Sequence, residues 1–333
     1  MTSSGSKVFR VSLSEENYMT SVVATRVCLA GDALDYLGGR TVCAAVDLPT
    51  IVVDTGRGVW FSPAHEALTR DLEQFVRDSY ADVTIEPTTL AATCTAPSPG
   101  GLGTSSSICI GLLREILRRC GEDPADAVRL AYDFEFQRTH GGGVDHVSIA
   151  HGGWLFTLGC DSGLPTTIDF RGAADGPQWS VTLIDTGLSK DCGDAIGRFR
   201  QLQRNHCAEL ASYIRDLDAT SAQVWEAVLE HDLKGVLAGM DDAHALMRDR
   251  YELSDPRIER LRDAAMSATG GVFKLTGSGN GGCLFTLHRS DEQSTMRTAL
   301  IKAGIEPMSV YHCRVAEGLD GDSAAPPAVK VQS

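Results

Sequence analysis

A glycine-rich turn at residues 97–107 runs directly into small hydroxyl residues. Glycine tolerates positive φ, so such a turn can aim several backbone N–H groups into one concavity. A helix that begins there adds unpaired amide donors and the positive end of its dipole, which together suit a phosphate. The turn lacks the lysine of a P-loop, so a nucleotide would be held by another scheme. An anion-binding turn is one interpretation, and a turn that only caps a helix is the other.

A second glycine-rich turn covers residues 277–282. Its glycines have the GxGxxG spacing, but a dinucleotide-binding turn opens a helix, and here the apolar strand pattern of residues 283–287 follows. The sequence also has neither the HRD nor the DFG motif of a protein kinase. The remaining interpretation is a tight hairpin whose backbone closely approaches either another loop or a ligand phosphate.

A third cluster, residues 135–146, places Asp145 on a run of glycines before a predicted helix. An acid there has few bulky neighbours and can face a substrate; the alternative is an N-cap, worth about 1 kcal/mol. Three nearby histidines, His140, His146 and His151, do not have a common zinc-ligand spacing, and no cysteine is close, so we do not predict zinc.

Composition limits the class of protein. A chain of 333 residues with 43% hydrophobic residues can bury a large core, and its length favours two domains. The net charge of −14 argues against broad nucleic-acid binding but allows an anionic small substrate in a locally positive pocket. Ten cysteines without a CxxC pair suit reduced thiols. Without a long apolar run or a signal-like start, we expect a cytoplasmic protein that binds no membrane.

The hydrophobic patterns predict an α+β fold. We expect strands over residues 22–29, 41–53, 83–95, 154–158, 181–185, 272–275 and 283–287. We expect helices over residues 65–79, 108–119, 126–138, 195–217, 221–240, 243–251 and 255–268. The predicted domains are residues 1–190, which contain the first turn and Asp145, and the helix-rich residues 191–320. Residues 321–333 are expected to be a disordered tail.

Three motifs in the same order resemble those of the GHMP superfamily of small-molecule kinases, over residues 22–287. The first matches the sugar-kinase version at Arg26, Gly31, Asp35 and Tyr36, with Asp32 in place of a glutamate. The second matches at Pro97, Gly101, Leu102, Gly103, Ser105 and Ser107, with Thr104 in place of a serine. The third matches at residues 274–277 and 281–283 and departs at Ser278 and Asn280.

The resemblance implies the two-domain GHMP kinase fold, with an S5-like N-terminal domain and a ferredoxin-like, helix-rich C-terminal domain. It also implies ATP and Mg²⁺ as cofactors. The implied ATP-binding residues are Pro97, Gly100, Gly101, Leu102, Gly103, Thr104, Ser105, Ser106 and Ser107, and the third-motif loop is Thr276, Gly277, Ser278 and Gly279. The implied Mg²⁺ ligands are Glu135 and one of Ser105 and Ser106.

By the same resemblance, Asp145 orients or deprotonates the accepting hydroxyl, and Arg26 keeps it ionised and stabilises charge. Homoserine kinases lack this aspartate, so its presence points to sugars or mevalonate. The implied substrate-binding residues are Asp32, Asp35, Tyr36, Gly142 and Gly143. The two aspartates can accept hydrogen bonds from vicinal hydroxyls, or they only form a turn.

Residues 140–145 resemble the GGGxDQ stretch of the heptose-7-phosphate and related anomeric sugar kinases, which phosphorylate the C1 hydroxyl of an aldose. We therefore expect an ATP-dependent kinase that phosphorylates a sugar or sugar phosphate at the C1 hydroxyl of a heptose- or octose-type aldose phosphate. Arg40, Arg138 and His140 are either partners of such a phosphate or surface residues. The expected partner is this small molecule, and a homodimer is compatible with it. The alternatives are a kinase of a non-sugar alcohol such as mevalonate, a non-catalytic sugar and nucleotide sensor, and a phosphate-eliminating decarboxylase of the same superfamily.

Overall fold

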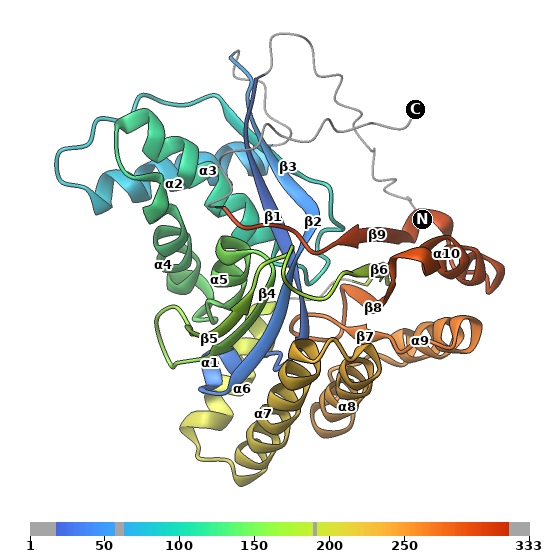
Figure 1. Cartoon of the computed structure of the whole chain (residues 1–333). Helices are drawn as coiled ribbons and strands as arrows, with labels where there is room; N and C mark the ends of the chain where they lie inside the picture. The colour runs from blue at the N-terminus through green and yellow to red at the C-terminus, as the bar shows by residue number, and fades with distance from the viewer. Residues whose placement is uncertain (1–17, 57–62, 189–191, 320–333) are drawn as a thin grey trace, which may run out of the picture.

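The structure, a computed structural model, describes residues 18–56, 63–188 and 192–319, and these form two antiparallel sheets with surrounding helices (Figure 1). The strands are β1 (Tyr18–Ala30), β2 (Arg40–Asp54), β3 (Leu90–Cys94), β4 (Trp154–Leu158), β5 (Thr166–Arg171), β6 (Trp179–Asp185), β7 (Lys274–Leu275), β8 (Cys283–Arg289) and β9 (Val310–Arg314). The helices are α1 (Leu34–Leu37), α2 (Pro63–Ser79), α3 (Thr104–Cys120), α4 (Ala127–Thr139), α5 (Val144–His151), α6 (Cys192–Arg204), α7 (Ala208–Leu229), α8 (Leu233–Tyr251), α9 (Pro256–Thr269) and α10 (Gln293–Lys302), with 3₁₀ turns at Pro124–Asp126, Ser290–Glu292 and Pro307–Ser309.

The first sheet is organised around β2, which pairs with β1 along most of its length. The other edge of β2 is shared: residues 50–54 pair with β3, and residues 40–44 pair with β4, which in turn pairs with β5. The alternation of buried and half-buried residues in β2 is broken by a nearly continuous buried run at residues 41–46, because both faces of the sheet are covered there.

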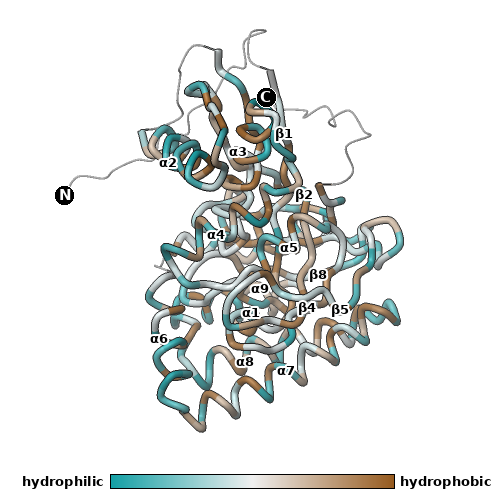
Figure 2. The backbone as a smooth tube through the Cα atoms, turned by 90° about the vertical axis from the view of Figure 1, so that its left-hand side faces the viewer, coloured by the Kyte–Doolittle hydropathy of each residue, from teal (hydrophilic) through white to brown (hydrophobic). Residues whose placement is uncertain are grey.

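Helices α2 to α5 cover one face of this sheet, and their apolar side chains form a core with β1, β2 and β3. In two orthogonal views, α2 and α3 lie towards one end of the molecule and α1 towards the other, with α4 and α5 between them (Figure 1, Figure 2). None of the helices in the described ranges is both long and apolar enough to cross a membrane.

The second sheet has the order β7-β8-β6-β9. A large core is shared by the inner sides of both sheets and by the antiparallel helices α7 and α8, with Trp154, Tyr213 and Phe285 among its buried members. Helices α9 and α10 pack on a separate core against β6, β7 and β8. The strands of the third motif are therefore attached to the first sheet by packed apolar side chains.

Two predicted helix boundaries are wrong. Residues 218–220 lie inside α7 and residues 241–242 inside α8, and the breaks fall instead at His206 and His231, which have positive φ. Within α7 the polar residues do not end the helix, because Thr220 and Ser221 donate their hydroxyls to carbonyls four residues earlier. The break residues are histidines rather than the usual glycine, so the sequence gives no C-cap signal there.

The strand predicted over residues 83–95 is also too long, since only Leu90–Cys94 is a strand. Pro87 cannot donate to a strand ladder, which is consistent with a later start. The prediction omitted β5, β9 and α10. The domain boundary at residue 190 stays a prediction. Strand β6 precedes this boundary, yet it pairs with β8 and β9, which follow it. Beyond β9, Val315 forms an isolated β-bridge with Val46 of β2, and Glu317 forms one with Gly152. The predicted tail lies outside the described residues.

The packing of β8 yields a stability prediction. Phe285 is fully buried in the core shared by both sheets, so Phe285→Ala should lower the free energy of unfolding by about 3–5 kcal/mol. The matched control is Phe170→Ala on β5, where the side chain is 36% exposed and the loss should be below about 1.5 kcal/mol. Urea unfolding of both variants measures the difference; equal losses would contradict the described core.

Candidate active site

A cavity of about 570 Å³ lies where α1, the 98–103 turn, the start of α3 and the facing ends of α4 and α5 meet. Its lining includes residues from all three sequence motifs and from the Asp145 cluster. The charged side chains in the lining are Arg26, Asp32, Asp35, Glu135, Arg138 and Asp145. Four carboxylates against two guanidinium groups give this cavity an acidic set of side chains, so any anion bound here must be held mainly by backbone amides and bound cations.

The backbone amides come from the start of α3. Gly103 is the N-cap residue in a left-handed conformation with φ 69°, and it makes no side-chain cap. The first helical amides of α3 therefore have no intrahelical acceptor, and the residues that carry them, Thr104, Ser105 and Ser106, line the cavity. A seventeen-residue helix adds a positive dipole end at the same place. The predicted anion-binding turn thus has the geometry that a phosphate requires.

Arg26 on β1 connects this turn to Asp145 on α5. Its Nε and Nη2 atoms lie 2.7 and 2.6 Å from Oδ1 of Asp145, and its Nη1 donates to the Gly101 carbonyl at 2.5 Å. Burial lowers the pKa of the Arg26 guanidinium, but the Asp145 carboxylate together with Cys43 and Cys28 more than compensates, so the pKa is raised. The described residues donate no hydrogen bond to Oδ2 of Asp145, which lies near Gly103 at the cavity wall. One carboxylate oxygen is thus fixed while the other can accept a proton.

Asp35 lies on the other side of Asp145, on α1. Its Oδ2 accepts a hydrogen bond from the Val144 amide at 3.2 Å, at the start of the helix that carries Asp145. Burial first, and then the charge of Asp145, raise the pKa of Asp35 to about 6. A Cβ atom at Gly142 would come within 2.0 Å of this carboxylate, so only glycine fits there. Tyr36 is its neighbour in the lining, below the Arg200 guanidinium.

Glu135 on α4 forms a second polar group at the cavity wall. Its Oε2 accepts the Ser106 hydroxyl at 2.6 Å and lies 2.9 Å from Nε2 of His146. Burial alone would raise the pKa of Glu135, but the contact with His146 and the hydroxyls of Ser106 and Ser105 bring it below its usual value. An ionised carboxylate beside two hydroxyls is a donor set that Mg²⁺ uses together with phosphates and waters. Sequence reasoning missed His146 as a partner, although it had noted the residue as an unlikely zinc ligand.

The third motif lies directly against the second. The Thr276 hydroxyl accepts a hydrogen bond from the Cys28 amide at 3.0 Å. The same hydroxyl donates to the Gly101 carbonyl at 3.3 Å. A Cβ atom at Gly101 would meet the Thr276 carbonyl at 2.4 Å, so the backbones touch. The interpretation of this hairpin as packed against another loop is therefore correct, and Gly277 and Ser278 also reach the cavity.

Asp32 and Lys274 form a buried ion pair at 2.5 Å behind these turns. The other oxygen of Asp32 accepts the Gly277 amide at 2.9 Å, and Lys274 also donates to the carbonyls of Cys28 and Leu275. Asp32 belongs to the lining, but its described contacts are structural, so its contact with substrate stays a prediction. Sequence reasoning matched Lys274 to the third motif without assigning it a partner.

Several predicted residues do not line the cavity. Among the described lining residues we do not find Pro97, Ser107, Gly143, Thr276 and Gly279. Ser107, for example, donates its hydroxyl to the Val23 carbonyl and its amide to Gly103. Arg40 is paired with Asp218, and neither it nor His140 reaches the lining. Arg138 does reach it, from a position over the Phe134 ring.

Known proteins that resemble this chain share one fold. Residues 225–306 match the family model described as GHMP kinases C terminal. The Methanococcus jannaschii mevalonate kinase superposes with a TM-score of 0.69 over 90% of this chain and 99% of that chain, at 17% identity. The Lactococcus lactis galactokinase complexed with galactose superposes with a TM-score of 0.66 over 90% of this chain and 95% of that chain, at 15% identity.

A mevalonate kinase of Aspergillus fumigatus is 26% identical over 260 residues, which are 71% of this chain and 47% of the relative. The chain spans about half the length of the curated relatives that it matches. The chain thus has the GHMP kinase fold, and the family-model match is confined to residues 225–306 of it. The predicted fold class is confirmed.

The raised pKa of Asp35 predicts a pH-dependent stability. The folded chain binds this proton more tightly than the unfolded chain, so the stabilisation is complete below about pH 3.8 and is lost as the pH rises through about 6. Asp35→Asn removes the charge and can still accept the Val144 amide. At pH 8 its free energy of unfolding should exceed that of the wild type by roughly 1–3 kcal/mol. Denaturant unfolding at pH 4 and 8 tests this; a gap that does not narrow at pH 4 would contradict it.

Proposed function

We propose that the chain is an ATP- and Mg²⁺-dependent kinase that transfers the γ-phosphoryl group of ATP to a hydroxyl of a small molecule. The observation that carries this proposal is the Arg26–Asp145 pair beside the first turn of α3, whose amides have no intrahelical acceptor and whose Ser106 is bonded to Glu135. Phosphoryl transfer depends mainly on positioning and charge stabilisation, and this arrangement supplies both. The GHMP kinase fold and the mevalonate kinase relatives support the same activity.

Each residue then has a chemical role. The amides of residues 104–106 hold the phosphates of ATP, and Glu135 with Ser105 or Ser106 holds the metal ion. Bound Mg²⁺ supplies neutralisation of charge on the phosphates. Oδ2 of Asp145 accepts the proton of the acceptor hydroxyl, whose oxygen forms the new bond to phosphorus while the bond to the β,γ-bridging oxygen breaks and ADP leaves. Arg26 holds Asp145 in place before this transfer and stabilises the added negative charge.

For the acceptor, we propose first a non-sugar alcohol of the mevalonate type. The two mevalonate kinase relatives, at 26% and 27% identity, carry this proposal. A sugar is the second candidate, and a specific observation favours it: Asp35 and Tyr36 face the cavity next to Asp145, where a buried carboxylate can accept hydrogen bonds from vicinal hydroxyls. Phosphorylation at C1 of a heptose or octose phosphate stays a prediction from the glycine-rich residues 140–145.

The assignment of the base predicts the effect of one substitution. Asp145→Asn keeps the shape of the side chain and removes its charge, so kcat should fall roughly 100-fold or more. The dissociation constant of ATP should change less than about threefold, because the α3 amides remain. Steady-state kinetics and calorimetric titration with MgATP measure the two quantities. Asp133→Asn, on the exposed side of α4, is the matched control and should leave kcat unchanged; wild-type turnover in Asp145→Asn would exclude Asp145 as the base.

A screen of acceptors separates the two candidates. Purified protein with MgATP should phosphorylate either mevalonate or an aldose, with the product position read by NMR. Asp35→Ala should lower kcat/KM for an aldose by roughly 10- to 100-fold, because it removes an acceptor of its hydroxyl hydrogen bonds. The same substitution should have a small effect on mevalonate. ATP binding without any transfer would support the sensor alternative, and release of CO₂ from a diphosphorylated acid would support the decarboxylase.

A further inference from the structure

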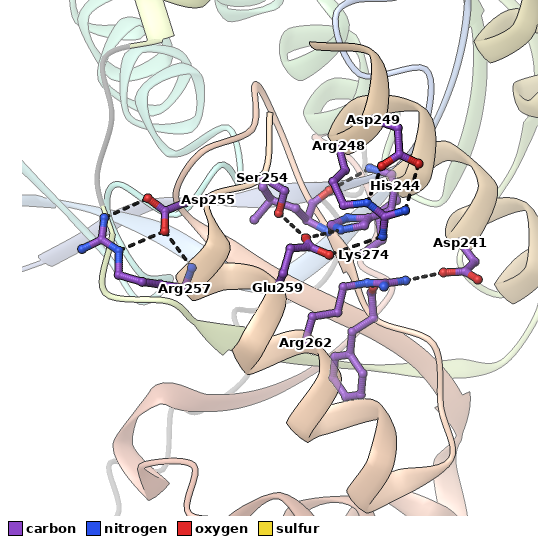
Figure 3. Close-up of polar contacts among 12 residues, drawn as sticks. Asp241, His244, Arg248, Asp249, Ser254, Asp255, Arg257, Glu259, Arg262 and Lys274 are labelled. Atoms are coloured by element: carbon purple, nitrogen blue, oxygen red, sulfur yellow. Dashed lines mark hydrogen bonds and ion pairs between the residues drawn. The ribbon is translucent and has the colours of Figure 1, made fainter. Parts of the chain in front are cut away.

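A buried polar network lies behind the third motif, between α8, α9 and β7 (Figure 3). At its centre is His244 on α8, whose side chain is 1% exposed. Nδ1 of His244 accepts the Leu275 amide at 3.2 Å, and Nε2 lies 2.8 Å from Oε1 of Glu259 on α9. Because an N–H donates to Nδ1, the proton of the neutral ring must be on Nε2, which donates it to Glu259.

The surroundings of His244 keep this one tautomer in place. Ser254 donates to the same oxygen of Glu259, and Arg248 lies 3.4 Å from its other oxygen. Burial, then the charge of Arg262 and that of Lys274, lower the pKa of His244 to about 4, although Glu259 opposes them. The imidazole is therefore neutral at pH 7, and Nδ1 stays an acceptor for the Leu275 amide.

From Leu275 the contacts continue to the nucleotide side of the molecule. The Leu275 carbonyl accepts Nζ of Lys274 at 2.8 Å, and Nζ pairs with Asp32. Asp32 in turn accepts the amide of Gly277 at 2.9 Å. Gly277 packs against Gly101 so closely that an added Cβ would meet the Gly101 Cα at 3.1 Å. A shift of β7 would therefore move the turn that forms one wall of the cavity.

We infer that His244 is a positioning residue for the nucleotide site: its Nδ1 anchors the Leu275 amide and so fixes the 276–279 turn against the 100–103 turn. His244 itself is not among the described residues that line the cavity. The inference rests on the proposed function only in that the ligand held at these turns is MgATP.

Two substitutions at His244 separate anchoring from bulk packing. His244→Asn can present its side-chain oxygen near the position of Nδ1, so it keeps the anchor and loses the bond to Glu259. His244→Gln can place its amide group near Nε2, so it keeps the bond to Glu259 and loses the anchor. The Gln variant should bind MgATP roughly three- to tenfold more weakly in calorimetry, and the Asn variant within about twofold of the wild type.

Hydrogen–deuterium exchange gives a readout that does not require nucleotide. The amides of Leu275 and Gly277 should exchange faster in His244→Gln than in the wild type and in His244→Asn. The control is Arg257→Gln, which breaks the exposed Asp255–Arg257 pair on the same α9 helix (Figure 3) and should change neither exchange nor affinity. If the wild type binds no MgATP, the proposed function fails, while this exchange measurement still tests the anchor.

Equal affinity and equal exchange in His244→Gln and the wild type would overturn the inference. So would equal losses in the Gln and Asn variants, because packing alone would then explain them. If His244→Gln does not fold, Glu259→Ala replaces it in the test. This substitution removes the acceptor of the Nε2 proton of His244, so the ring is no longer held in the tautomer that leaves Nδ1 free to accept. A folded Glu259→Ala should show faster exchange at Leu275 and weaker MgATP binding, and wild-type values for both would also overturn the inference.

Discussion

The buried ion pair between Asp32 and Lys274 is the interaction on which the rest of the site depends. Two charges removed from water are stable only if their remaining hydrogen-bonding atoms are also satisfied. Here the ammonium donates to two further carbonyls, and the second carboxylate oxygen accepts the Gly277 amide. The residues are 242 positions apart in the sequence, so the pair fixes the end of β1 to the third motif. Loss of either partner would leave an unpaired charge in the core.

The chemistry of the site follows from this fixed arrangement. With β1 held against β7, the Arg26 amide donates to the Leu102 carbonyl and its guanidinium donates to the Gly101 carbonyl, so the glycine-rich turn before α3 and the Asp145 carboxylate share one support. Such donors cost little reorganisation when negative charge develops, which is the main source of catalysis in phosphoryl transfer. Burial and the neighbouring Asp145 carboxylate raise the pKa of Asp35, so its ionised form lowers the stability of the fold. Such perturbed carboxylates are typical of functional sites.

The fold class could be predicted from the sequence, because turns with glycine and hydroxyl residues are local signals, whereas the roles of the site residues stay predictions. Gly101, Gly142 and Gly277 could be predicted as special positions, but their contacts across the chain could not. The roles of Lys274 and His244 depend on burial and on partners from other elements, which a single sequence does not reveal. The breaks at His206 and His231 were missed because these exposed residues carry no glycine signal, although the amides that follow them, of Cys207 and Asp232, close the helix ends by donating to the Leu202 and Ala227 carbonyls.

The most direct test of the account is a crystal structure with Mg²⁺ and a non-hydrolysable ATP analogue. We predict that the β- and γ-phosphates accept hydrogen bonds from the amides of residues 104–106, with the metal ion on Glu135 and with the γ-phosphate near Arg26 and Asp145. Phosphates bound away from the start of α3, or a nucleotide whose γ-phosphate is remote from Asp145, would contradict the proposal that this cavity performs phosphoryl transfer.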